Sequence, residues 1–376
     1  MKKTLLITIL IMSVFLTAKA EEDIDLLDSY AKEYSAAVEK GIEGIEIPGF
    51  DTEEILKELN SGKLSYTPKE ILEYILKILL GEVAENAKLL AIVLALSVLS
   101  SYLSGLKDGF GGEAVANCGF YACYVIIAGI AATAFYDAAV CTGEAVRSIS
   151  FFMRVIVPVI ITTMLTSGAV ISAATLEPAL LAMVEIAVWI IETVFIPAVM
   201  ISAALNIVNG MSDKFKTDRM VKLLGSAVKW GLTVTLTVFV SLAGLKSIAA
   251  SGVDGLTVKL SKFATANLIP MVGGILAESV ETVMSCSVVI KNSVGIMGII
   301  CVLLIAFRPV IKVAAILIMF RVAAAVAEPV SESKIVECMS RLADSIAVLF
   351  SMLTAVTLMF IMVLTIMINT GNSVYM

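Results

Sequence analysis

The residue types that carry most enzyme chemistry are scarce in this chain, and none has the spacing of a catalytic or metal site. The chain contains no histidine, which excludes His-based triads, His-ligated zinc or haem, and histidine pH switches. Its six cysteines have no C-x-x-C spacing, and most lie in or beside apolar runs, where free cysteine behaves as a small hydrophobic residue. We therefore predict no catalytic residue, no bound cofactor and no metal site.

Charged residues inside apolar runs are better candidates for a functional role. An ionised side chain at the bilayer centre costs at least about 2.5 kcal/mol, so it needs a counter-charge or a polar path. We expect the acids to pair with basic residues of other helices, including Arg321. The alternatives are a polar or proton-coupled path, or charges at headgroup level that snorkel into water. The candidates are Glu185 and Glu192, Glu278 and Glu281, each pair on one helix face, with Lys291, Arg308 and Lys312.

A second candidate is a broken helix in the stretch 262–295. Asn267, Pro270, Gly273 and Gly274 stand close together there, and proline followed by two glycines interrupts a helix. Irregular backbone at membrane depth persists only where protein or water satisfies its hydrogen bonds. We expect this element to lie inside the helix bundle or to line a cavity. The alternative is an amphipathic segment along the membrane surface.

The elements that position these residues are predicted to be membrane helices. Of 376 residues, 59% are hydrophobic and 16% charged, against roughly 45–50% and about 25% in ordinary globular chains. Mean hydropathy is +0.98. Few charges remain to cover the outside of a soluble core. The fold class is therefore all-α, a polytopic helical membrane protein.

Apolar runs separated by short polar breaks predict seven or eight transmembrane or re-entrant helices. An additional run at 294–307 is short and abuts Arg308-Pro309, so it is either a span or a half-helix joined to the next run. The clear runs are 87–104, 117–136, 155–175, 180–208, 230–250, 309–327 and 346–369.

The beginning of the chain is predicted to face away from the cytoplasm. Residues 1–20 have a basic start, a short apolar stretch and an Ala18-Lys-Ala20 cleavage site, which is typical of a signal peptide; an uncleaved anchor is the alternative. Residues 21–85 carry 17 acidic and 6 basic residues and two helix-start signals, at 51–54 and 67–70. We expect a small acidic, helical, extracytoplasmic region there, followed by a membrane domain over 86–376.

The most basic stretch between apolar runs, 209–229, conflicts with that orientation. Basic loops stay in the cytoplasm, yet one crossing per run places 209–229 outside. Either one of the first four runs is re-entrant, with 155–175 as the candidate, or the basic stretch is an interfacial helix held outside.

Several scattered motifs resemble one known family. In the C-terminal half they are Lys262-Phe-Ala-Thr-Ala-Asn-Leu-Ile-Pro270-Met-Val-Gly-Gly274, Val289-Ile-Lys-Asn-Ser-Val-Gly295 and Arg308-Pro309-Val-Ile-Lys312. Nearer the start they are Gly49-Phe-Asp-Thr-Glu-Glu54 and Ser61-Gly-Lys-Leu-Ser65. Over about residues 45–370 the chain resembles the stage III sporulation protein AE family of endospore-forming bacteria.

This resemblance implies a non-enzymatic, multi-pass subunit in the mother-cell membrane around the forespore. There it is expected to join a channel or secretion complex with other stage III sporulation A-operon membrane proteins and a forespore membrane partner, after engulfment. The chain has no G-x-x-x-x-G-K-[ST] loop, so ATP energy would come from a separate ATPase subunit. No basic face for nucleic acid is visible. An autonomous secondary transporter with intramembrane carboxylates is the alternative. An intramembrane enzyme would need a catalytic dyad that the sequence does not display.

Overall fold

The described part of the chain consists of long helices. The computed structural model describes residues 68–105, 112–211, 217–268 and 273–370. No strand occurs within these segments, so the all-α prediction is confirmed. The predicted signal peptide and most of the predicted outer region lie outside them. The helices are α3 (Pro68–Gly105), α4 (Gly112–Thr166), α5 (Val170–Ile190), the π-helical turn η2 (Ile191–Phe195), α6 (Ile196–Met211), α7 (Asp218–Leu268), α8 (Gly273–Ala327) and α9 (Ser333–Asn369).

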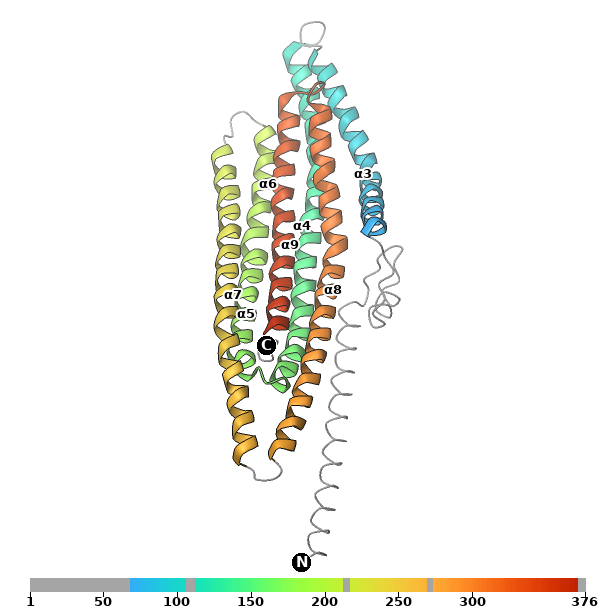
Figure 1. The fold of residues 1–376 in the computed structure, drawn as a ribbon. Coiled ribbons are helices and arrows are strands. Elements are labelled where there is room, and N and C mark those ends of the chain that lie inside the picture. Colours follow the sequence, from blue (N-terminus) through green and yellow to red (C-terminus); the bar gives the residue numbers. More distant parts are fainter. Residues whose placement is uncertain (1–67, 106–111, 212–216, 269–272, 371–376) are drawn as a thin grey trace, which may run out of the picture.

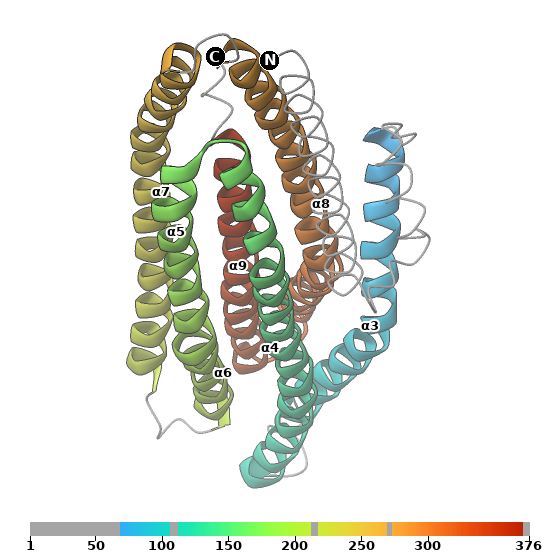
Figure 2. The ribbon, with the colours of Figure 1, turned by 90° about the horizontal axis from the view of Figure 1, so that it is seen from below.

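α9 is the central helix of the bundle. It contacts α4, α5, α6, α7 and α8, while α3 and α7 lie on opposite sides of the molecule (Figures 1 and 2). Along its most apolar stretch 61% of the residues are buried, against 17% along that of α7. α9 is therefore the core of the fold, and α7 is far more exposed along its apolar stretch.

Five helical rods in the described segments are long and apolar enough to cross a membrane, as the polytopic prediction requires. α5, η2 and α6 join end to end in one of them, and a shorter apolar stretch lies at Ala91–Leu103. The five are Asn117–Thr166, Val170–Met211, Asp218–Gly244, Met284–Ala327 and Ser333–Asn369.

Apolar runs that look separate in the sequence share helices in the structure. The run 117–136 and most of 155–175 lie on α4, and 294–307 and 309–327 both lie on α8. α4 and α8 have 55 residues each, or about 80 Å, more than twice the roughly 30 Å of a hydrocarbon core. Parts of both helices therefore extend beyond the hydrocarbon. The polar residues between the runs are helical positions and not loops.

The expected re-entrant stretch 155–175 contains the turn between α4 and α5. Gly168 has a left-handed backbone, with φ 87, which glycine adopts without steric cost. Its N–H donates to the carbonyl of Leu165 at 3.2 Å, and Ala169 N–H donates to that of Met164 at 3.1 Å. This is the Schellman pattern that ends a helix. The chain reverses here between two long helices, and the run does not form an element of its own.

A π-helical turn interrupts the rod of α5 and α6. Pro197 has no N–H, so it cannot complete the usual bond to the carbonyl four residues earlier. The N–H of Ile196 bonds instead to the carbonyl of Ile191, five residues back. The wider turn changes the direction of the side chains around Glu192.

The order of the helices bears on the orientation conflict found in the sequence. α6 ends and α7 begins at the same end of the bundle as the α3–α4 connection, whereas the α4–α5 turn lies at the other end (Figure 1). Because two of the first four runs share α4, three helical rods precede the basic stretch instead of four. Of these, α4 and the rod of α5 and α6 are long and apolar enough to cross a membrane, while α3 has only the shorter apolar stretch Ala91–Leu103. If α3 also crosses, an outer start of the chain places 209–229 on the cytoplasmic side, without a re-entrant element.

Close contact between α8 and α9 depends on glycine. A Cβ added at Gly295 would overlap Cγ1 of Ile368, and one at Gly298 would touch Leu364. Gly129, in contrast, has open space where a Cβ would stand. Gly295 and Gly298 therefore let α8 approach α9 closely, whereas Gly129, on α4, makes no such contact.

We predict that Gly295→Ala destabilises the protein by about 1–3 kcal/mol, because overpacking forces the half-buried Ile368 to move. Gly129→Ala is the matched control and should be neutral or stabilising, by up to about 1 kcal/mol, since alanine favours helix. Thermal unfolding of the purified full chain in detergent measures both. Equal stability of the two variants would contradict the close α8–α9 contact.

Candidate functional site

Two ion pairs form a ladder between α4 and the α5–η2 rod. Arg154 binds Glu185 with both donors, Nε at 2.9 Å and Nη2 at 2.5 Å, and Ser150 Oγ donates to the same carboxylate at 3.2 Å. Nε of Arg147 lies 3.6 Å from Oε1 of Glu192. Both arginines and both glutamates are seven residues apart, so each pair of like residues shares one helix face. We call these four residues the α4–α5 ladder.

The ladder gives Glu185 and Glu192 different partners from those expected. The sequence suggested Arg308, Lys312 and Arg321 as counter-charges, but the basic partners are Arg147 and Arg154 of α4. The signal that could have identified Arg147 and Arg154 is their seven-residue spacing, which matches that of the glutamates in an antiparallel neighbour.

The other basic candidates lie elsewhere in the bundle. Arg308 and Lys312 of α8 are charged neighbours of Cys141 on α4, together with Glu144 and Glu82 of α4 and α3. Charges of both signs from three helices therefore act on the middle of α4. Arg321 instead pairs with α9, through Asp344 at 2.6 Å.

Lys291 is fully buried at the end of α9. Its exposed fraction is 0%, and its Nζ donates a hydrogen bond to the carbonyl of Thr370. The last carbonyls of a helix have no partner within that helix and carry partial negative charge, so a lysine there both satisfies and neutralises them. Lys291 thus fixes the end of α9 against α8.

The broken-helix candidates lie at the connection between α7 and α8. Asn267 is in the last turn of α7, Gly273 and Gly274 begin α8, and Pro270 lies outside the described residues. Both helices extend past the α4–α5 turn at this end of the bundle (Figure 1). The side chains of Glu278 and Glu281 also lie outside the described part. Whether this element lines a cavity stays a prediction.

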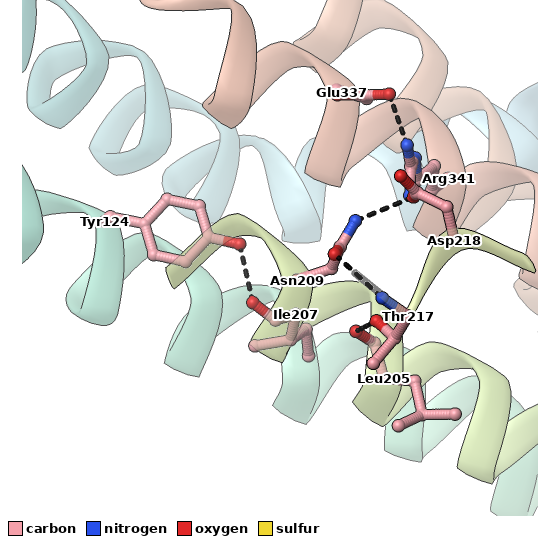
Figure 3. Close-up of polar contacts among 8 residues, drawn as sticks. All are labelled: Tyr124, Leu205, Ile207, Asn209, Thr217, Asp218, Glu337 and Arg341. Atoms are coloured by element: carbon pink, nitrogen blue, oxygen red, sulfur yellow. Dashed lines mark hydrogen bonds and ion pairs between the residues drawn. The ribbon is translucent and has the colours of Figure 1, made fainter. Parts of the chain in front are cut away.

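A polar network joins α6, α7 and α9 at the other end of the bundle. Asp218, the first residue of α7, accepts hydrogen bonds from Asn209 Nδ2 at 2.7 Å and from Arg341 of α9 (Figure 3). Arg341 also binds Glu337 one turn earlier. Thr217 N–H donates to Asn209 Oδ1 at 3.4 Å. We call Asn209, Asp218, Glu337 and Arg341 the terminal network.

Tyr124 connects α4 to this region. Its hydroxyl donates to the carbonyl of Ile207 at 2.8 Å, and its ring lies over Gly210, where a Cβ would overlap the phenol (Figure 3). Sequence reasoning missed both the tyrosine and the terminal network, because their residues come from four helices and share no spacing.

A cavity of about 500 Å³ lies beside the terminal network, between α6, α7 and α9. Its lining mixes apolar side chains with polar and charged ones. They are Ala198, Val199, Ser202, Asn206, Asp218, Val221, Lys222, Leu224, Gly225, Ser226, Lys229, Arg341, Asp344, Ser345 and Val348.

Among the described residues no group of three or more histidine, cysteine, aspartate or glutamate side chains is placed to hold a metal ion. The polar chemistry of these residues consists of ion pairs and hydrogen bonds between helices. Their arrangement can fix helix register. The cavity beside the terminal network is large enough for a ligand.

Comparison with known proteins gives a match along most of the chain. The model of the family described as Stage III sporulation protein AE matches residues 50–371. The protein of that name from Bacillus subtilis (strain 168) is 30% identical over 317 residues, covering 84% of this chain and 79% of the relative. No solved structure matches the chain.

We predict that Arg154 and Glu185 are energetically coupled. A double-mutant cycle with Arg154→Gln and Glu185→Gln should give a coupling energy of about 1 kcal/mol or more, near the upper range measured between membrane helices. Arg147→Gln with Glu192→Gln is the matched control and should couple more weakly, because these side chains approach only to 3.6 Å. Thermal unfolding in detergent measures both cycles. A coupling near zero for the first pair would show that the ladder does not hold α4 against α5.

Proposed function

The chain belongs to the stage III sporulation protein AE family, and from this premise we propose a specific role in sporulation. The protein is a non-enzymatic, multi-pass subunit of the mother cell–forespore channel or secretion complex, needed for forespore development after engulfment. Its partners are other stage III sporulation A-operon membrane proteins, a forespore membrane partner and a separate ATPase. The observation that carries the proposal is the family match over residues 50–371, which includes every helix that the structure describes, from α3 to α9.

The physical character of the chain supports a membrane subunit. Several of its helices are apolar and long enough to span a bilayer, which fits a membrane protein. α7 is mostly exposed along its apolar stretch, and an exposed apolar helix needs either lipid or the helices of a partner around it. A subunit that assembles with other membrane proteins meets both conditions.

The alternative, an autonomous secondary transporter, rests on the intramembrane carboxylates. The carboxylate of Glu185 accepts hydrogen bonds from Nε and Nη2 of Arg154, and that of Glu192 forms the ion pair with Arg147. A carboxylate that binds and releases a coupling ion must become free during each cycle. Ladder pairs that fix helix register therefore favour the subunit over the transporter.

Deletion of the gene from the sporulating host should prevent formation of heat-resistant spores, and the wild-type gene should restore them. A tagged chain purified from sporulating cells should retain sporulation membrane proteins and an ATPase. The same chain reconstituted alone in vesicles should move no solute. Gradient-driven uptake by the chain alone would contradict the proposal and support the transporter.

We propose that the start of the chain lies outside the cytoplasm and the basic stretch 209–229 inside. In a background without the six native cysteines, Met220→Cys should react with a membrane-impermeant thiol reagent only after access to the cytoplasm. Val170→Cys, beside the α4–α5 turn, should react from the outer side. Both positions are exposed, so each serves as the accessibility control for the other. The reverse labelling pattern would contradict this orientation.

A further inference from the structure

The cavity between α6, α7 and α9 contains a polar atom without a partner. Asn206 is 4% exposed, and its Oδ1 has no hydrogen-bond partner within the described residues. A buried acceptor left unsatisfied costs about 1–3 kcal/mol. Asn206 lines the cavity, so a molecule bound there can supply the missing donor. The occupant therefore needs a hydroxyl or N–H group.

The same cavity carries an excess of available positive charge. Its two carboxylates are already paired, Asp218 with Arg341 and Asp344 with Arg321. Lys222 and Lys229 have no ion-pair partner in the described part of the chain. They stand seven residues apart on one face of α7, about 10 Å along the helix. An anionic group is the complementary ligand.

The surroundings of the cavity indicate that its ligand is an amphiphile. The walls of the cavity include the apolar side chains of Val199, Leu224 and Val348. The cavity reaches the surface of the protein at the exposed Lys222 and Lys229. Trp230, next to Lys229, is 71% exposed, and tryptophan beside lysine is typical of the membrane–water interface. Basic pockets between membrane helices at that level bind anionic lipid headgroups.

We propose that this cavity binds the headgroup of an anionic glycerophospholipid that carries a free hydroxyl, the chemistry of phosphatidylglycerol. The phosphate lies between Lys222 and Lys229, and a glycerol hydroxyl donates to Oδ1 of Asn206. The acyl chains leave along the apolar outer face of α7. The lipid fills the space between α7 and the core helices and joins α7 to the bundle.

The test compares the purified full chain in nanodiscs of dioleoyl-phosphatidylglycerol, dioleoyl-phosphatidylcholine or dioleoyl-phosphatidic acid. Phosphatidylglycerol should raise the thermal unfolding temperature most, and phosphatidic acid less, because it lacks the glycerol hydroxyl. In native mass spectrometry the bound lipid should be phosphatidylglycerol. Lys222→Gln with Lys229→Gln should weaken its retention by roughly fivefold per lysine. Arg219→Gln, on α7 but outside the cavity lining, is the matched control and should change little.

Asn206→Leu tests the hydroxyl contact separately. It removes the unsatisfied oxygen and keeps the same branched side-chain skeleton, so the variant should remain folded in phosphatidylcholine and lose the preference for phosphatidylglycerol over phosphatidic acid. Asn292→Leu is the control, because its Oδ1 is also buried without a partner but lies outside this cavity. It should keep the preference.

Three results would overturn the proposal. One is equal stabilisation by phosphatidylglycerol and phosphatidylcholine in the wild-type chain. Another is undiminished phosphatidylglycerol preference in both the lysine and the Asn206 variants. The third is saturation of the site by soluble glycerol 3-phosphate with no gain from acyl chains. If the wild-type chain retains no sporulation partners but keeps its lipid preference, this result counts against the proposed function alone.

Discussion

A charge on an apolar helix must find its counter-charge on a neighbouring helix, and this requirement determines how α4 and α5 align. Arg147 and Arg154 repeat every seven residues, and so do Glu185 and Glu192 on the antiparallel rod. A shift of one residue along either helix would rotate both pairs out of contact together. The ladder therefore selects one register, which apolar packing of similar helices cannot do alone.

The same requirement anchors the central helix at both ends. Arg341 and Asp344 bind α7 and α8 near the beginning of α9, and Lys291 satisfies a carbonyl at its end. Between these anchors, residues 345–369 carry no charge, and many of them are buried among five neighbouring helices. Polar contacts thus set the position of α9, and close packing through Gly295 and Gly298 provides the contact area with α8.

The sequence predicts what depends on one helix and fails where several helices meet. Composition and hydropathy identify an all-α membrane protein, and the spacing of Glu185 and Glu192 correctly places them on one face. The partners predicted for these glutamates are wrong, because spacing within one helix does not reveal which neighbouring helix faces them. Hydropathy also divides α4 into two runs, since it measures polarity and not backbone continuity. The cavity around Asn206 requires three helices to be placed and has no signature in the sequence.

The distribution of paired and unpaired charges separates two parts of the bundle. Around α9 the chain provides its own counter-charges, so this core is defined by internal contacts. On the α7 side, Oδ1 of Asn206 lacks a donor, Lys222 and Lys229 form no ion pair within the described segments, and the apolar face is exposed. The surrounding membrane can supply each of these missing partners. Internal ion pairs fix α4 against α5, whereas α7 depends on molecules outside the chain. Changes near α9 should consequently act through folding, and changes on α7 through what the protein binds.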